Sequence, residues 1–374
     1  MQTKESVEQV RSRAINFLDE FIKEDGSFTA FLDFVKNHDE LELLFRGNSG
    51  DNGEVIIYYK NNIVWKLSKN SESAKVTINY NHLRYCVDWE DKMKQLHEYG
   101  FPIKYPVEKV KKVKGKERRS YESDYVSVSK KISKNEKFEM DFVAGTYEII
   151  KEVMSDYFYC NYENGKEEDV SKLKDYFREY LGVTQSNRKK PNYCEKENQQ
   201  KFFSCNSSMK NGVFVYDLEY KEPHKDKAEK ETKLAVKKRE KMNKPDCFGI
   251  RFDEERNPIK FVMIEIKSKA GSESGSSGTK EHLDGMMDDL RDKDFVKARL
   301  IEAKEIMEQY RSLGLKGLSK EIFIPDFSQF ADKIGTEILV VYTDELADSR
   351  MAGTYVTSSE KYGEIEYQVE VFRG

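Results

Sequence analysis

Three charged residues in the C-terminal half of the chain have the types and the spacing needed for metal-dependent hydrolysis. Asp246 follows Pro245, and Glu265 and Lys267 come after a gap of 18 residues. Two carboxylates are hard oxygen ligands suited to Mg²⁺ or Mn²⁺, and a bound ion neutralises charge that develops on phosphorus. A lysine beside the ion can orient or help to deprotonate the attacking water. The three residues therefore predict phosphodiester hydrolysis.

Two predicted strands must bring these side chains together. The segments FGIRFD and FVMIEIK, joined by the turn EERNP, form a hairpin with Asp246 at the start of one strand and Glu265 on its neighbour. Glu265 and Lys267 are two positions apart, so their side chains leave the same face of the sheet. The run from Ile259 to Ile264 is apolar except for one lysine. A charged pair at its end needs partners or a metal, because burying a charge is costly.

The tripeptide ExK is weak evidence by itself, because 35% of the residues are charged. It also begins at four other glutamates: Glu90, Glu219, Glu231 and Glu302. Strand context favours Glu265, and two alternatives stay open. In the first, Glu265 and Lys267 form a surface ion pair at a strand end and Asp246 only follows a turn-forming proline. In the second, Glu219 and Lys221 are the functional pair.

The pattern Pro245-Asp246, the 18-residue gap and Glu265-Ile266-Lys267 resemble the PD-(D/E)xK nuclease superfamily over about residues 205–345. This superfamily includes restriction endonucleases and many phage-defence and repair nucleases. The resemblance implies a mixed sheet flanked by helices, in which the Asp and Glu hold the metal and the Lys assists the water. It also implies a further metal-binding acid, for which Glu219 is the best match and Asp217 a competitor.

A histidine begins the predicted helix after the motif. In the superfamily this place often carries a residue that contacts phosphate or the scissile strand, so the resemblance implies a catalytic role for His282. Lys280 is a second candidate for the same contact. The alternative is that His282 is an ordinary residue at the start of a helix.

The elements around this motif predict an α/β chain, α+β overall, with more than one domain. From Val213 onward the predicted order is strand, strand, strand, helix, strand. Before it come helices over residues 4–37, a small antiparallel meander over 41–80, helices over 140–182 and a polar loop over 184–200. We therefore expect a regulatory or targeting domain (1–130), a helical connector (131–200) and a nuclease domain (201–374).

Two segments are rich in basic residues. Residues 104–119 hold eight Lys or Arg against two Glu, and residues 221–244 hold ten against five acids. Such segments can contact a nucleic-acid backbone and release its counterions. The alternatives are a solvated linker or loop for the first and a solvated helix for the second.

Several other classes of protein are disfavoured. The five cysteines form no zinc-type cluster, so we expect them to be reduced and structural. The sequence has no nucleotide-binding glycine loop, no GxSxG nucleophile turn and no HExxH zinc helix. No apolar run is long enough to span a bilayer and the first residues lack a signal-peptide pattern, which predicts a cytoplasmic protein without a membrane partner.

These observations and the resemblance lead us to expect a Mg²⁺-dependent endonuclease that cuts DNA, with Mn²⁺ as a substitute ion. The resemblance further implies an effector of bacterial defence against phage, with an activating or partner protein. A homo-oligomer, for example a dimer, is expected because one site cuts one strand. The alternatives are a nuclease that cleaves RNA and a non-catalytic module that binds nucleic acid or a partner protein.

Overall fold

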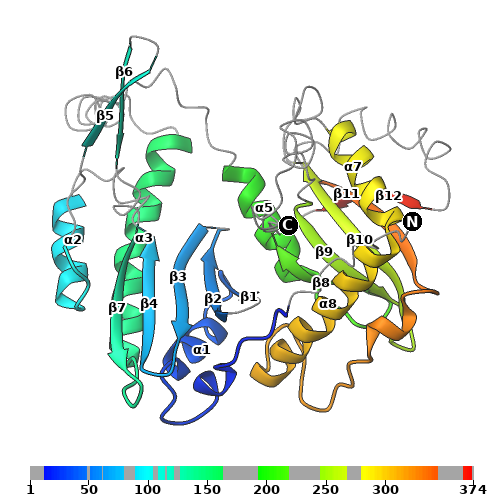
Figure 1. The fold of residues 1–374 in the computed structure, drawn as a ribbon, viewed down its shortest axis with the longest axis horizontal. Coiled ribbons are helices and arrows are strands. Elements are labelled where there is room, and N and C mark those ends of the chain that lie inside the picture. The colour runs from blue at the N-terminus through cyan, green and yellow to red at the C-terminus, as the bar shows by residue number, and fades with distance from the viewer. Residues whose placement is uncertain are drawn as a thin grey trace, which may run out of the picture. The chain divides into compact units, whose positions relative to one another are not determined.

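The chain forms two compact units, which Figure 1 shows as a ribbon. One unit comprises Ile15–Tyr193, and the other comprises Met1–Ala14 together with Cys194–Gly374. The expected division at residues 130 and 200 stays a prediction. The computed structural model describes residues 12–48, 51–60, 62–79, 89–103, 108–113, 116–121, 127–162, 193–218, 245–267, 279–343 and 365–372.

A five-stranded antiparallel sheet is the base of the N-terminal unit, and its strands follow the order β1-β2-β3-β4-β7. The strands are β1 (Leu41–Asn48), β2 (Asp51–Tyr59), β3 (Asn62–Lys69), β4 (Ser73–Asn79) and β7 (Ser127–Ser133). The first four form the antiparallel meander that the sequence predicts over residues 41–80. Strand β7 extends it by pairing with β4.

Helices cover the apolar face of this sheet through aromatic contacts. The ring of Phe31 lies 5.1 Å from that of Trp65, and the ring of Phe34 lies 5.1 Å from that of Tyr147. Helices α1 and α3 therefore share one core with β3. The helical elements of the unit are η1 (Leu18–Phe21), α1 (Thr29–Lys36), α2 (Trp89–Glu98) and α3 (Met140–Tyr162).

Two sequence-based expectations about the first 130 residues are wrong in part. Residues 12–17 are not helical, because the backbone of Arg13 bonds to side chains of a helix in the C-terminal unit: its N–H donates to Glu305 and its carbonyl accepts from Gln309. The basic stretch expected as a linker or loop contains two paired strands, β5 (Glu108–Val113) and β6 (Lys116–Tyr121). Strand pairing uses backbone groups, and basic side chains do not prevent it.

A five-stranded mixed sheet forms the centre of the C-terminal unit, in the order β12-β11-β10-β9-β8. Strands β8, β9 and β10 are antiparallel, whereas β10, β11 and β12 are parallel. The strands are β8 (Gly212–Leu218), β9 (Cys247–Phe252), β10 (Pro258–Lys267), β11 (Gly335–Thr343) and β12 (Glu366–Phe372). The predicted mixed α/β fold class is confirmed.

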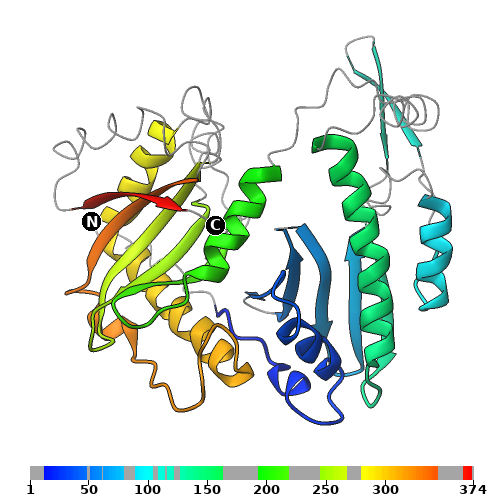
Figure 2. The same cartoon turned by 180° about the vertical axis from the view of Figure 1, so that it is seen from behind.

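Helices α7 and α8 cross one face of this sheet, and α5 lies against the other (Figures 1 and 2). Asp292 caps the start of α8 by accepting from the backbone N–H groups of Asp294 and Phe295, and Gly314 ends it with a φ of 65°. The helical elements of the unit are α5 (Tyr193–Cys205), α7 (Thr279–Arg291), α8 (Lys293–Leu313) and η5 (Phe327–Phe330). Among the described residues, no helix is long and apolar enough to cross a membrane.

Close packing keeps β8 and β9 in register. A side chain at Gly249 would place its Cβ 2.8 Å from a methyl group of Val213 on β8, so only glycine fits there. The next residue toward the start of the strand, Phe248, stacks its ring between those of Tyr216 and Phe261, at 6.3 and 5.7 Å. These contacts fix the end of β9 that carries Asp246.

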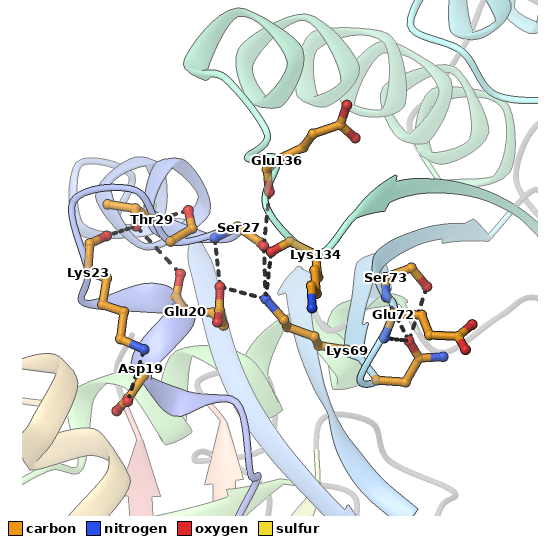
Figure 3. Close-up of polar contacts among 12 residues, drawn as sticks. Asp19, Glu20, Lys23, Ser27, Thr29, Lys69, Glu72, Ser73, Lys134 and Glu136 are labelled. Carbon is orange, nitrogen blue, oxygen red and sulfur yellow. Dashed lines mark hydrogen bonds and ion pairs between the residues drawn. The ribbon is translucent and has the colours of Figure 1, made fainter.

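A polar cluster joins several segments of the N-terminal unit around Lys69, at the end of β3 (Figure 3). Its Nζ lies 2.8 Å from the carboxylate of Glu20 and donates to the hydroxyl of Ser27 and the carbonyl of Lys134. The backbone N–H of Ser27 donates to the same carboxylate, and its hydroxyl donates to the carbonyl of Glu136. Burial raises the pKa of Glu20, but the bonds from Lys69 and Ser27 outweigh burial and hold the pKa below its ordinary value of 4.5.

We predict that Glu20→Gln lowers the free energy of unfolding of the N-terminal unit by about 1–2 kcal/mol at neutral pH, since charge-assisted hydrogen bonds contribute about this much. The carboxylate of a group with a lowered pKa stabilises the fold fully above its unfolded-state pKa and ceases to do so as the pH falls through the folded-state pKa. The difference between the two proteins should therefore shrink as the pH falls below 4.5.

Urea unfolding followed by the fluorescence of Trp65, which is fully buried in this core, measures the effect. Glu24→Gln is the matched control, because Glu24 is an exposed residue of the same segment. An equal loss in both variants, or a loss in Glu20→Gln that does not change with pH, would contradict the prediction.

Candidate active site

The predicted hairpin is present and brings Asp246 to the end of β10. In the register of β9 and β10, Cys247 pairs with Ile264, so Asp246 stands at the same end of the hairpin as Glu265. The carboxylate of Asp246 accepts a hydrogen bond of 2.7 Å, through Oδ2, from the backbone N–H of Ile266. The loop aspartate is thereby fastened to the strand that carries the other two residues of the motif.

Glu265 and Lys267 lie side by side on β10, as their spacing predicts. Lys267 Nζ is 2.5 Å from Glu265 Oε1, and the two residues are only 3% and 2% exposed. They are therefore not the surface ion pair of the first alternative. Removing both charges from water is costly, and their mutual attraction recovers only part of that cost.

The second oxygen of Glu265 differs in its surroundings from the first. Glu265 Oε2 is buried and has no hydrogen-bond partner among the described residues. A buried acceptor without a partner is rare, because it loses its hydration without compensation. A divalent cation is the natural partner for a buried carboxylate oxygen of this kind, so the residues present fit the expected Mg²⁺ or Mn²⁺.

The donor set consists of hard oxygen ligands. Asp246 and Glu265 both offer carboxylate oxygens, and Mg²⁺ in proteins usually takes one or two carboxylates and keeps several waters. Within the described residues, no group of three or more His, Cys, Asp or Glu is placed to hold a metal ion. Glu219, expected as a third metal-binding acid, and Lys221, its partner in the second alternative, lie outside the described residues.

His282, on α7, contacts the same carboxylate. Its Nδ1 lies 2.8 Å from Glu265 Oε1, the oxygen that also accepts from Lys267. With Glu265 ionised, its carboxylate can only accept, and Nδ1 of His282 then carries the hydrogen. The Nε2 atom of the ring is then the atom able to meet a phosphate or water. The side chain of Lys280, the second candidate, lies outside the described residues.

A further residue of the site was missed in the sequence. Gln199, on α5, donates from its Nε2 to Asp246 Oδ1 at 2.6 Å and is 4% exposed. The polar composition of residues 184–200 predicts a loop, but α5 begins at Tyr193. One short sequence pattern could have revealed the helix: Gln199, Phe202 and Phe203 have the i, i+3, i+4 spacing of one helix face. In the structure all three are buried.

Asp217, the competitor of Glu219, serves a different purpose. Its carboxylate lies 2.8 Å from the guanidinium of Arg13, and its other oxygen accepts from the backbone N–H of Leu218. Glu302 on α8 also faces this guanidinium at 3.7 Å and lies 3.1 Å from Arg299. These four charged side chains, Arg13, Asp217, Arg299 and Glu302, are each no more than 3% exposed, and we call them the buried charge network.

The network contains two basic and two acidic side chains, all of them buried away from solvent. Burial raises the pKa of Glu302 to about 7, against the lowering effect of Arg299 and Arg13. The network also explains why the first described residues belong to the C-terminal unit, since Arg13 is held there by its side chain and by both of its backbone polar groups. Asp217 is therefore a structural residue in this arrangement.

Comparisons with known proteins add no assignment to this geometry. A scan against protein-family models and searches of curated proteins and of solved structures find no match to the chain. The chemistry of the site is therefore argued from its own residues.

We predict that Arg13→Ala lowers the free energy of unfolding of the C-terminal unit by about 3–5 kcal/mol, because it removes the counter-ion that lies 2.8 Å from the buried carboxylate of Asp217. Far-UV circular dichroism during urea unfolding is the suitable measurement. Both tryptophans, Trp65 and Trp89, belong to the other unit and do not report on this one.

Arg291→Ala provides the control, because the ion pair of Arg291 with Asp288 is exposed to solvent and such pairs contribute at most about 1 kcal/mol. If Arg13→Ala proved no more destabilising than this control, the network would not hold the N-terminal segment as described.

Proposed function

We propose that this protein is a metal-dependent nuclease of the PD-(D/E)xK type, with Asp246, Glu265 and Lys267 as its catalytic set. The observation that supports the proposal most is the carboxylate of Glu265: one oxygen is bonded to Lys267 and His282, while the other is buried and has no hydrogen-bond partner among the described residues. An oxygen in this state can serve as a cation ligand.

Each residue has a role that follows from its contacts. Asp246 and Glu265 would hold the ion, and Glu219 remains the proposed third ligand. When bound, the ion supplies Lewis-acid activation of water and neutralises charge on the phosphate. Lys267, a compact cation beside these carboxylates, orients the attacking water and stabilises negative charge on the phosphate oxygens. His282 presents its Nε2 to the phosphate or to the scissile strand, because its Nδ1 is engaged with Glu265.

The proposed substrate is DNA. The basic hairpin β5–β6 and the Lys-rich segment 221–244 are candidate contacts for a phosphate backbone, which binds such residues with release of counterions. RNA is the alternative substrate, because this metal chemistry does not depend on the sugar. A cytoplasmic effector of phage defence, assembled as a homo-oligomer and controlled by a partner protein, is the biological setting we propose.

We predict that the purified chain cleaves plasmid DNA with Mg²⁺ and that EDTA abolishes the cleavage. Lys267→Ala and Asp246→Ala should each lower the cleavage rate by about 10²–10⁴-fold, the usual effect of removing a proton-transfer or charge-stabilising group. Lys260→Ala is the matched control, because Lys260 lies on the same strand but pairs with Glu337, away from the motif.

Cleavage that persists in both variants would rule out the proposed site. Loss of cleavage in Lys221→Ala but not in Lys267→Ala would instead favour the pair Glu219 and Lys221. Nucleic-acid binding without cleavage, unchanged in Asp246→Ala, would favour the non-catalytic binding module. A parallel assay with single-stranded RNA distinguishes the two substrate classes.

A further inference from the structure

We propose that Gln199 is a positioning residue of the metal site, which fixes the carboxylate of Asp246 in the orientation that the cation requires. The inference rests on the proposed function, since it assigns Asp246 as a metal ligand. It concerns a residue on α5, outside the motif of Asp246, Glu265 and Lys267. The role follows from a hydrogen bond, from burial and from the way α5 is anchored.

Asp246 precedes β9 and is only partly buried, so packing alone does not hold its side chain. Hydrogen bonds hold both of its oxygens: Gln199 Nε2 bonds to Oδ1 at 2.6 Å and the backbone N–H of Ile266 bonds to Oδ2 at 2.7 Å. One donor on each oxygen fixes the plane of the carboxylate. A carboxylate offers about four lone-pair sites, so these two bonds are compatible with a cation on the same group.

These donors come from two different elements, α5 and β10. Ile266 lies between Glu265 and Lys267, so its N–H fastens Asp246 to the strand of the other two motif residues. Gln199 comes from the helix on the other side of the sheet (Figure 2). Asp246 is therefore bridged between α5 and β10, and the amide of Gln199 is the side-chain half of that bridge.

Helix α5 can present Gln199 accurately because its next turn is anchored in the unit. Phe202 and Phe203 are 2% and 0% exposed, and the ring of Phe202 lies 5.4 Å from that of Phe372 on β12. Lys316 Nζ donates to the carbonyl of Phe203 at 2.6 Å. Gln199 is three residues before Phe202, on the same side of the helix. The side chain of Gln199 is therefore attached to an anchored stretch of backbone and is itself buried.

Residues that orient metal ligands through a hydrogen bond commonly matter for affinity almost as much as the ligands do. An amide is suited to this task, because it donates a hydrogen bond without adding charge to the site. Loss of the amide removes the donor on Oδ1 and loosens the orientation of the Asp246 carboxylate, so that the cation must order this group when it binds. The expected consequence is weaker metal binding in a protein that is still folded.

The test measures Mn²⁺ affinity directly, by the electron paramagnetic resonance signal of free Mn²⁺ in the presence of the full chain. Gln199→Met keeps the length and the buried volume but cannot donate, and it should weaken Mn²⁺ binding by about 10–100-fold. Gln200→Met is the matched control: Gln200 is the neighbouring residue of the same helix, is 5% exposed and should leave the affinity unchanged. Gln199→Asn, an amide that is one methylene too short to reach Asp246, should behave like Gln199→Met.

Far-UV circular dichroism of each variant checks the fold, and the Asn variant serves if the Met variant does not fold. Binding of equal strength in the wild type and in a folded Gln199 variant would overturn the positioning role while leaving the proposed nuclease function intact. An equal loss in the Gln200 variant would also overturn it, because the effect would then belong to the helix as a whole. A wild type that does not bind Mn²⁺ would overturn both proposals.

Discussion

The desolvation of one carboxylate is the constraint on which the C-terminal unit depends. Glu265 lies at the end of an apolar strand in the middle of the sheet, where water cannot reach it. Lys267 and His282 bond to one of its oxygens, and the other has no hydrogen-bond partner in the part of the chain that the structure describes. A bound cation would stabilise a carboxylate in this state, and the proposed chemistry depends on that cation.

The rest of the unit can be understood as what holds this carboxylate and its neighbours in place. Parallel pairing with β11 and antiparallel pairing with β9 keep β10 central. The close approach of β8 at Gly249 and the stacked ring of Phe248 set the end of β9, from which Asp246 reaches β10. The buried charge network fastens β8 to α8 and to the N-terminal segment around Arg13.

Much of this arrangement could be predicted from the sequence, because the relevant signals are local. Two-residue spacing on an apolar strand predicts that Glu265 and Lys267 are neighbours, and the turn EERNP predicts the hairpin that brings Asp246 to them. The meander of the N-terminal unit followed from short β-rich runs separated by turn residues. Each of these inferences needs only the period of a strand and the chemistry of a turn.

The parts that could not be predicted depend on contacts between residues distant in the chain. Gln199 is 47 positions from Asp246, and its helix begins in a polar stretch without a clear apolar period. Arg13 is 204 positions from Asp217, and the pairing overrides the helical pattern of the segment in which it lies. Asp217 and Glu219 are two positions apart in the sequence, so the spacing treats them alike, and it is the contact of Asp217 with Arg13 that separates it from Glu219.

The most direct test of the central claim is a crystal structure of the protein grown with Mn²⁺, with anomalous scattering used to locate the ion. The account predicts a peak within about 2.5 Å of Glu265 Oε2 that also contacts the carboxylate of Asp246. At saturating Mn²⁺, the absence of a peak there, with Glu265 Oε2 bonded to a protein donor instead, would contradict it.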